Sequence, residues 1–576
     1  MTKSKTGTFL KTIGAPEASL LRILPVVLSL VCCQAVIATP GKTEINPVST
    51  PSQEKSVGGK ISGDVSLSGR VRVTEDLLVL PGATLTVAPG TVVTFSKSES
   101  NKVEPEYFFG GTELVVRGTL RAAGASFLFQ ERSGGIVVDG GGADLADTVV
   151  AGAETGITLL RGGAVAADGV LTVTDCRVGV SLFPGSGGWT GAGEVRLRKN
   201  GLGAVRFPGA GALPGTFRPG DSEEADILEW DAGPVPREEK QTSQPAPRAG
   251  ALHLGDTFLD RNRTLSGDVV VDGVIRVAPG ATLAIAPGSR LFFAFRDTDG
   301  DGIGENGIFL QGNLDARGTK ERPIGFHALD GKGPGRWDAI NFMASDRGEN
   351  VIGNAEISGA YRGIHAHFSR LRGSGIRISG CYRGIQFQES GVDLSGVEVA
   401  SSSSAIRCRD SDVRIDGIRI RDTASGGNFF RSRVAISSPD VSRPGWYGFR
   451  FRESRVELAS GEVREALVGV SVQEGSAGLD RTSIASCGLA GFALLEGDVK
   501  IDNCALSGAR LDAVSATRGK AAVTGGRIEG FGRYAVKLGG PAEVSLLGVA
   551  VAGPGGAGNP VYDGKVAPGL GVVRIE

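Results

Sequence analysis

Residues 364–384 read IHAHFSRLRGSGIRISGCYRG, and residues 385–405 read IQFQESGVDLSGVEVASSSSA. Both begin with apolar residues at the first and third positions, which alternate as the side chains of a β-strand do. Equivalents of Ile364 follow at intervals of 21, 21, 21, 22, 21, 22, 22 and 22 residues, at Ile385, Ile406, Gly427, Phe449, Val470, Phe492, Val514 and Val536. So narrow a period over nine units indicates a solenoid. We call these nine residues the anchor positions.

Each unit contains two more strand-like patches. An apolar residue recurs seven residues after the anchor, as at Leu371 and Val392, and an apolar pair follows at twelve and fourteen, as at Ile376 and Ile378. Five consecutive units also carry serine five residues after the anchor, at Ser369, Ser390, Ser411, Ser432 and Ser454. Three strands in 21–22 residues predict a three-faced coil, with the anchor and the second residue after it facing inward.

A second duplication divides the chain. Residues 81–91 read PGATLTVAPGT and residues 279–289 read PGATLAIAPGS, each an alternating strand between Pro-Gly turns. We interpret these stretches as the starting rungs of two consecutive modules, 58–212 and 263–576. Residues 213–262 carry charge clusters and a Pro-rich run and are expected to be a linker or an excursion. Residues 558–576 are expected to close the second stack.

The repeats resemble those of right-handed parallel β-helix proteins of the pectate-lyase-like family, over most of 60–210 and 263–576. The resemblance implies an all-β fold with one strand per coil in each of three parallel sheets, and rungs about 4.8 Å apart. It does not specify an activity, because such folds host lyases, hydrolases, epimerases, adhesins and non-enzymatic envelope proteins.

The N-terminus is predicted to be a targeting segment. Lys3, Lys5, Lys11 and Arg22 precede the short apolar run Ile23–Val31. We favour a signal peptide at 1–38 cleaved after Ala38, followed by a flexible leader at 39–57. Lipoprotein processing at Cys33 and an uncleaved anchor are the alternatives. The expected location is bacterial-type and secreted (periplasmic, cell-surface or extracellular), with no transmembrane span after processing.

The net charge and the cysteines limit the kinds of partner and site that the sequence predicts. The net charge is −1, from 62 basic and 63 acidic side chains, so no bulk field favours nucleic acid as a partner. The cysteines after residue 38 are Cys176, Cys381, Cys408, Cys487 and Cys504. Their spacing matches no metal motif, and we expect buried free thiols that pack as small apolar residues.

The outward residues of the repeated strand form the clearest candidate for a binding surface. One and three residues after the anchors, donor-rich side chains follow one another along the predicted stack. We call this set the outward strip: His365, His367, Gln386, Gln388, Arg407, Arg409, Phe430, Arg450 and Arg452. It suits an acidic or neutral glycan lying along the axis, with Phe430 available for stacking. An ordinary solvated sheet face would carry similar polar residues.

The outward strip contains no recognisable set of catalytic residues. Glycosidic hydrolysis usually needs two carboxylates at a fixed separation, and the strip contains none. An acidic column occurs one position further on, at Glu389, Asp410, Glu453, Glu474 and Glu496, with Arg431 inserted. We interpret it as a surface charge ladder near a turn, with a catalytic acid pair or a cation site as alternatives. Arg407, Arg409, Arg450 or Arg452 could serve a lyase by analogy, but no motif selects one.

Residues 297–305 read DTDGDGIGE, which alternates Asp297, Asp299 and Asp301 before Glu305. Such spacing is typical of calcium loops, because hard carboxylate oxygens suit Ca²⁺. The stretch departs from an EF-hand, since Glu305 is ninth and Ile308 is twelfth. The two interpretations are a short structural Ca²⁺ site formed by these four residues and a plain acidic turn.

The sequence therefore predicts a secreted or cell-envelope β-helix protein with a binding or scaffolding role, with carbohydrate or a surface polymer as its candidate partner. A polysaccharide lyase, or another polysaccharide-active enzyme, is the main alternative. An adhesin or envelope assembly component is the third class.

Overall fold

The chain is a parallel β-solenoid of about 21 turns, about 60% strand, with no helix among the described residues. The structure is a computed structural model that describes residues 54–97, 108–213, 215–234, 245–330, 333–553 and 571–576, all within one compact unit of residues 52–576. The predicted parallel β-helix is confirmed. The predicted signal peptide, most of the leader and residues 558–570 lie outside the described part. In the described residues we find no helix of the length and hydropathy needed to cross a bilayer.

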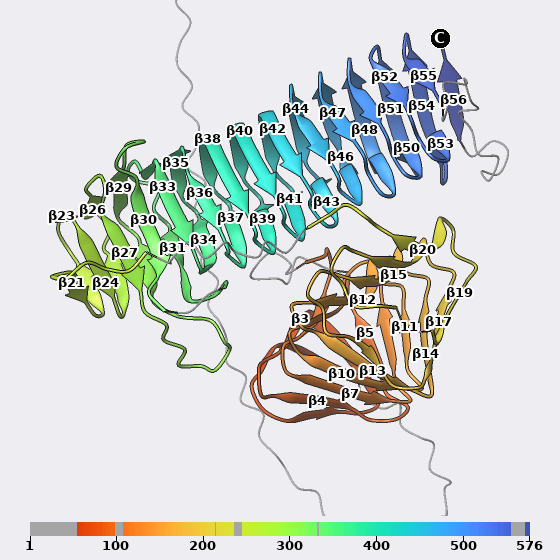
Figure 1. The fold of residues 1–576 in the computed structure, drawn as a ribbon, viewed down its shortest axis with the longest axis horizontal. Coiled ribbons are helices and arrows are strands. Elements are labelled where there is room, and N and C mark those ends of the chain that lie inside the picture. The colour runs from red at the N-terminus through yellow and green to blue at the C-terminus, as the bar shows by residue number, and fades with distance from the viewer. Residues whose placement is uncertain (1–53, 98–107, 214, 235–244, 331–332, 554–570) are drawn as a thin grey trace, which may run out of the picture. The chain divides into compact units, whose positions relative to one another are not determined.

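The first stack comprises twenty strands, drawn from red to yellow in Figure 1. They form a 14-stranded and a 6-stranded sheet, in which every ladder is parallel and β3 contributes to two faces. The strands are β1 (Lys55–Ile61), β2 (Val65–Leu67), β3 (Arg70–Val79), β4 (Thr84–Val87), β5 (Val92–Phe95), β6 (Glu113–Val116), β7 (Thr119–Ala123), β8 (Ser126–Phe129), β9 (Gly135–Asp139), β10 (Gly142–Ala146), β11 (Val149–Ala151), β12 (Thr155–Leu160), β13 (Ala164–Asp168), β14 (Val170–Thr174), β15 (Val178–Leu182), β16 (Gly188–Thr190), β17 (Glu194–Arg198), β18 (Leu202–Arg206), β19 (Phe217–Gly220) and β20 (Ala225–Glu229).

The second stack comprises thirty-six strands, drawn from green to blue in Figure 1, again with parallel ladders. They are β21 (Leu252–Leu254), β22 (Thr257–Leu259), β23 (Arg263–Leu265), β24 (Asp268–Val271), β25 (Val274–Val277), β26 (Thr282–Ile285), β27 (Arg290–Phe293), β28 (Gly307–Leu310), β29 (Asn313–Arg317), β30 (Ile324–Ala328), β31 (Trp337–Met343), β32 (Val351–Gly353), β33 (Ala355–Ser358), β34 (Ala360–His367), β35 (Arg370–Ser374), β36 (Arg377–Ser379), β37 (Arg383–Gln388), β38 (Gly391–Ala400), β39 (Ser404–Arg409), β40 (Asp412–Arg421), β41 (Ser425–Phe430), β42 (Arg433–Ser442), β43 (Tyr447–Arg452), β44 (Arg455–Ala459), β45 (Glu462–Arg464), β46 (Val468–Asp480), β47 (Ser483–Ala485), β48 (Ala490–Asp502), β49 (Ala505–Ser507), β50 (Asp512–Ala516), β51 (Gly519–Thr524), β52 (Arg527–Glu529), β53 (Tyr534–Leu538), β54 (Ala542–Leu547), β55 (Ala550–Ala552) and β56 (Val572–Ile575).

The nine anchor positions stack in register, as the period predicts. Ile364 pairs with Ile385, Ile385 with Ile406, and the series continues to Val514 and Val536. Every anchor except Gly427 belongs to the buried apolar core of the second stack. The hydrophobic effect therefore fixes the rung register, since a one-residue slip would turn each of these side chains outward.

The coils that begin at the anchors from Ile364 to Val470 each turn at three corners that have left-handed backbone. In the coil that begins at Ile385, these are Glu389, Gly396 and Ser401, with φ of 42°, 57° and 48°. The serine column lies beside the first corner. The backbone N–H of Ser369 donates to Oγ of Ser390 at 3.1 Å, and each later serine of the column repeats this contact with the next. The repeated serines thus satisfy backbone donors that the turn removes from the ladders.

The duplicated PGAT stretches occupy equivalent places, but neither one begins its stack. β4 pairs with β2 before it, and β26 pairs with β23. The expectation of starting rungs is corrected for this reason: a whole rung, β21–β23, precedes the second copy. The earlier strands are short and partly exposed, so they lack the apolar alternation by which strands are recognised in a sequence.

The segment expected to be a linker, 213–262, also contains strands. β19 and β20 extend the first stack, and β21 and β22 begin the second. Lys55 to Val57, assigned to the flexible leader, pair with β3. Asp226 and Glu229 are exposed residues of β20, a strand whose Leu228 is buried.

All five described cysteines are buried and free. Burial raises the pKa of the Cys176, Cys381, Cys408 and Cys487 thiols to about 12, and that of Cys504 to about 11. They therefore act as small core residues and not as nucleophiles or metal ligands at neutral pH.

Candidate functional site

The outward strip differs from the expectation of an open polar face, because most of it is buried. His365, Gln386 and Arg407 are buried, with relative exposures of 6%, 0% and 1%. Nδ1 of His365 lies 2.6 Å from Oδ1 of Asn341, and Nε2 of His367 lies 2.8 Å from a carboxylate oxygen of Glu389. A periodic pattern gives the side of the strand on which a residue lies, but not what covers that side.

The first stack supplies part of the cover. The guanidinium of Arg407 donates to the carbonyl of Phe108 at 3.2 Å, although 299 residues separate the two in sequence. Gln388 is buried, and Arg409 is half-buried with its Nε 2.9 Å from Asp410. The middle of the predicted binding surface is therefore used for contact within the chain.

A buried ion pair joins the two stacks. Glu154 and Arg450 lie 2.9 Å apart, with side-chain exposures of only 3% and 5%, and the Tyr447 hydroxyl donates to the same carboxylate at 2.8 Å. Burial, together with the Glu154 charge, raises the pKa of Tyr447 to about 12, so this hydroxyl keeps its proton.

A second charged cluster lies on Asp139. Its carboxylate is bound by Arg161, by Arg117 at 3.3 Å and by the hydroxyl of Tyr382 from the second stack. Burial alone would raise the pKa of Asp139, but the two guanidinium groups outweigh burial and hold it below its usual range. The aspartate therefore remains charged, as its three donors require.

Apolar contacts lie between these clusters. The Trp446 ring packs against Phe109 and Phe183, with centroids 5.4 and 5.6 Å apart, and Trp446, Tyr447, Tyr382, Tyr361 and Leu467 belong to the apolar cluster of the first stack. Lys60 pairs with Asp301 at 2.7 Å, and Glu224 pairs with Arg533 and Lys537. The two stacks are thus docked by buried apolar and ionic contacts and by the partly exposed Lys60–Asp301 pair.

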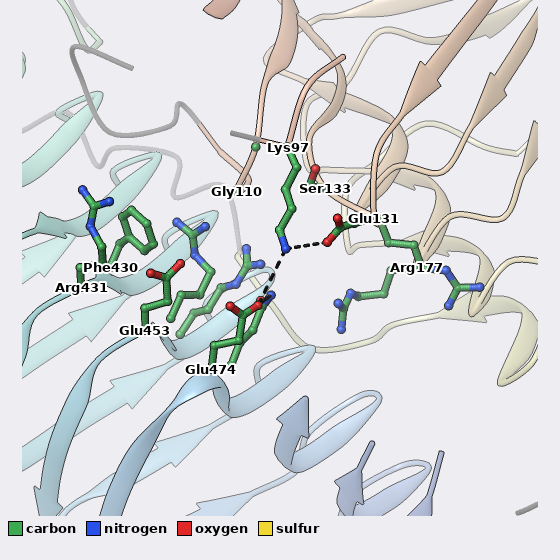
Figure 2. A pocket seen from close by; sticks show the side chains of 14 residues that line it. Lys97, Gly110, Glu131, Ser133, Arg177, Phe430, Arg431, Glu453 and Glu474 are labelled. Atoms are coloured by element: carbon green, nitrogen blue, oxygen red, sulfur yellow. Dashed lines mark hydrogen bonds and ion pairs between the residues drawn. The ribbon is translucent and has the colours of Figure 1, made fainter. Parts of the chain in front are cut away.

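A cleft of about 420 Å³ remains open between the docked stacks. Figure 2 shows side chains from both stacks directed into one space, with Lys97 bridging Glu131 of its own stack and Glu474 of the other, at 2.6 and 3.9 Å. The lining consists of Lys97, Gly110, Gly111, Glu131, Arg132, Ser133, Arg177, Phe430, Arg431, Arg450, Arg452, Glu453, Gln473 and Glu474. Its volume falls within the range of about 300–1,000 Å³ that is usual for ligand sites.

The charges in this cleft are largely balanced. Arg132 pairs with Glu223 at 3.0 Å, Arg431 with Asp410 at 2.7 Å, and Arg450 with Glu154. The hydrogen bond to Glu131 raises the pKa of Lys97 above its ordinary value, so Lys97 stays protonated. Among the described residues no carboxylate lies within ion-pair distance of Arg177, and its buried Nε has no hydrogen-bond partner. Arg177 thus has spare donor capacity.

Phe430 is placed differently from the expectation. Its ring is only 5% exposed, and the guanidinium carbons of Arg431 and Arg452 lie 4.5 and 4.7 Å from its centroid. Cation–π contacts with these arginines occupy the ring. Phe430 therefore shapes the wall of the cleft and has no open face for stacking on a sugar.

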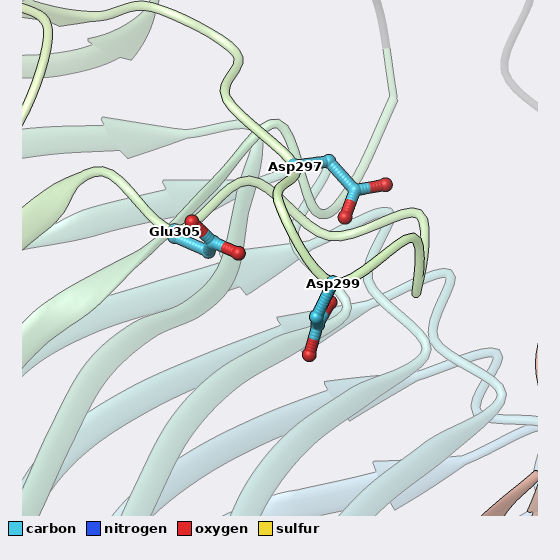
Figure 3. Close-up of side chains that lie close together, drawn as sticks. All are labelled: Asp297, Asp299 and Glu305. Atoms are coloured by element: carbon cyan, nitrogen blue, oxygen red, sulfur yellow. The ribbon is translucent and has the colours of Figure 1, made fainter. Parts of the chain in front are cut away.

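The acidic loop between β27 and β28 brings three of its four predicted ligands together. Carboxylate oxygens of Asp297, Asp299 and Glu305 lie within 4.8 Å of one another, and Figure 3 shows these side chains on the loop. Asp301 instead accepts a hydrogen bond from the Lys60 ammonium group, which also lies 3.2 Å from a carboxylate oxygen of Asp299. The Asp297 carboxylate accepts hydrogen bonds from the backbone N–H groups of Gly300, Asp301 and Gly302. These contacts satisfy the turn by themselves, and the calcium site stays a prediction.

No pattern in the sequence indicated the part of the cleft that the first stack contributes. Lys97, the turn that holds Glu131 and Ser133, and Arg177 come from three separate turns of the first stack, which no spacing connects. A signal for docking itself was present. Three residues before the anchors, six of the nine positions carry large apolar residues, Tyr361, Tyr382, Trp446, Leu467, Leu489 and Leu511, and the other three carry Ser403, Ala424 and Arg533. Large apolar residues beside outward positions indicate a covered face.

Comparison with known proteins assigns the chain to no family. No family model matches the chain, and no curated protein matches it. Among solved structures, a variant of the periplasmic alginate epimerase AlgG aligns at 10% identity over 81% of this chain and 85% of its own, with a TM-score of 0.27. An α-1,3-glucanase from Streptomyces thermodiastaticus aligns at 12% identity over 58% and 69%, with a TM-score of 0.25. An alginate lyase from a Paenibacillus species aligns at 13% identity over 51% and 92%, with a TM-score of 0.14. Likeness at this level carries no argument about activity.

Proposed function

We propose that this protein is an extracytoplasmic β-helix scaffold that binds a glycan segment in the cleft between its two stacks. The observation that carries the proposal is the lining of that cleft. Guanidinium, amide and hydroxyl donors lie beside three carboxylate acceptors, and carboxylates outside the lining pair with three of its arginines. A hydroxyl-rich chain offers donors and acceptors in similar numbers, so it matches such a lining.

Binding is favoured over lyase chemistry by the state of the arginines. A β-elimination needs a group that neutralises the substrate carboxylate and a base that takes the adjacent proton. Arg407 and Arg450 are buried and held by the first stack, and Arg409 is paired with Asp410. Residues committed to such contacts are poorly placed to exchange them for substrate.

The test is a binding screen of acidic and neutral oligosaccharides by calorimetry. Arg177→Ala is expected to weaken the tightest ligand at least tenfold, which corresponds to about 1.4 kcal/mol. The matched control is Arg121→Ala, an exposed arginine on an outer sheet of the same stack, which should leave the affinity unchanged. Equal affinity of the Arg177 variant and the wild type would contradict the proposed site.

The same screen separates binding from catalysis. Incubated polysaccharides are assayed for new reducing ends and for unsaturated products that absorb in the ultraviolet. Turnover that is lost in the Arg177 variant would replace the scaffold proposal by an enzyme acting in this cleft. Ligand recovered intact supports the scaffold.

A further inference from the structure

The turn between β22 and β23 carries an acceptor sequence for asparagine-linked glycosylation. Residues 260–264 read DRNRT, in which Asn262 is followed by Arg263 and Thr264. Nowhere else in the 576 residues does serine or threonine come two positions after an asparagine, with a residue other than proline between them. Asp260 lies two positions before the asparagine, where bacterial oligosaccharyltransferases require an acidic residue. The stretch therefore has every element of a bacterial-type acceptor.

The structure places this acceptor sequence on the surface of the second stack. Asp260, Arg261, Asn262 and Thr264 are all exposed, whereas the next residue, Leu265, is buried. Asn262 directly precedes β23 and Thr264 lies within it, so the amide and the hydroxyl are both on the outer side of the rung. A transferase that contacts these two groups can therefore reach both in the folded protein.

The amide of Asn262 has its reactive nitrogen available. Its Oδ1 accepts a hydrogen bond from the backbone N–H of Thr282 at 2.9 Å, which orients the side chain. Within the described part of the chain, no group accepts a hydrogen bond from its Nδ2. Glycosylation replaces one hydrogen of Nδ2 and leaves Oδ1 unchanged. The modified residue therefore keeps its contact with Thr282, and the turn need not rearrange.

We propose that Asn262 is an acceptor site for N-glycosylation, with an oligosaccharide carried on a polyprenyl diphosphate as the donor. Nδ2 forms a bond to C1 of the first sugar, and the bond between C1 and the diphosphate oxygen breaks. The polyprenyl diphosphate leaves with the bonding electron pair, and the proton lost from Nδ2 passes to a base of the transferase. This transfer takes place outside the cytoplasm, where the expected signal peptide directs the chain.

A glycan at this turn would also cover apolar surface. Phe258 of β22 is four residues before Asn262 and is 69% exposed, the highest value among the exposed large apolar side chains of the described residues. Four residues span at most about 14 Å, a distance that an oligosaccharide of several sugars covers. A bulky hydrophilic chain beside Phe258 is expected to increase solubility.

The experiment incubates the purified, folded chain with a purified bacterial oligosaccharyltransferase and a polyprenyl diphosphate oligosaccharide of known mass. The wild type should gain the mass of one oligosaccharide, on the chymotryptic peptide that contains Asn262. Trypsin is avoided because it would cut at both Arg261 and Arg263. Asn262→Gln and Thr264→Ala should abolish the gain. The turn lies outside the cleft lining, so this test is independent of glycan binding in the cleft.

The matched control is Thr264→Ser, which keeps the hydroxyl and should be modified as the wild type is. Asp260→Ala should lose the modification, because it removes the acidic residue and leaves the asparagine and the threonine in place. Melting temperatures confirm that each variant is folded, and a short acceptor peptide in the same reaction confirms that the enzyme is active. A wild-type chain that stays unmodified while the peptide is glycosylated would overturn the proposal. Modification that persists in Asn262→Gln or in Asp260→Ala would overturn it equally.

Discussion

The carboxylate of Glu154 lies where the two stacks meet, and its charge is balanced by Arg450 in a site almost closed to water. Glu154→Gln keeps an acceptor for the Tyr447 hydroxyl but leaves the guanidinium without its counter-charge. We expect the free energy of unfolding to fall by about 3 kcal/mol, as is usual when a buried pair loses one partner. Chemical denaturation of both proteins measures this difference.

The control is the same substitution at an exposed pair. Asp144 lies 3.6 Å from Arg121, and both side chains are more than 60% exposed. Asp144→Asn should change stability by less than about 1 kcal/mol. Equal losses at the two sites would show that the Glu154 pair contributes no more than a surface contact.

Phe368 occupies a corner of its coil where the backbone is left-handed. Phe368 has a φ of 48° and is 53% exposed, so its ring gains little from burial while its Cβ strains the turn. Phe368→Gly should stabilise the protein by about 1 kcal/mol, seen as a higher melting temperature. Phe368→Ala keeps the strain and should not. A stabilised alanine variant, or a destabilised glycine variant, would contradict this explanation.

The acidic loop between β27 and β28 offers a test of the calcium hypothesis. If Asp297, Asp299 and Glu305 bind Ca²⁺, added calcium should raise the melting temperature and a chelator should lower it, because a ligand that binds only the native state stabilises it. Asp297→Asn with Asp299→Asn should abolish the shift. The same melting temperature in calcium and in chelator would rule out the site and leave a self-satisfied turn.

The strands of the second stack were largely predictable from the sequence, and their surroundings were not. The anchors are apolar because they lie in one core, and a constant coil length repeats them at a constant interval. The same polar pattern arises in two ways. In some solenoids the residues beside the anchors are polar because water covers them, and here they are polar because charged groups of the first stack contact them. Only residues such as Tyr382 and Trp446, too apolar for a solvated surface, distinguished the two cases.

The cleft could not be predicted for a related reason. Its lining comes from rungs hundreds of residues apart in sequence, as Lys97 and Glu474 illustrate, and it forms only because the stacks dock. Short, weakly apolar strands such as β21 escaped recognition for a different reason. A terminal rung needs few buried residues, so it carries little of the alternation that identifies a strand.

Docking of the two stacks depends on the close approach of the Gly445 backbone to the Phe183 ring. A Cβ there would meet the ring of Phe183 and the carbonyl of Ala424, so Gly445→Ala should force the stacks apart. We expect a larger radius of gyration in small-angle scattering and a red shift in emission as Trp446 becomes exposed. Gly478→Ala is the control, since a Cβ there meets nothing within 4 Å. Unchanged scattering for Gly445→Ala would show that the contact can relax without separation.

The claim that a glycan binds between the stacks is tested most directly by a crystal structure with the tightest oligosaccharide from the screen. Sugar density is expected in the cleft, with hydroxyl oxygens within about 3.2 Å of the Arg177 guanidinium and the Gln473 amide. Sugar bound instead on the outer faces of the second stack, for example in the groove beside Gly396 and Gly417, with the cleft empty, would contradict it.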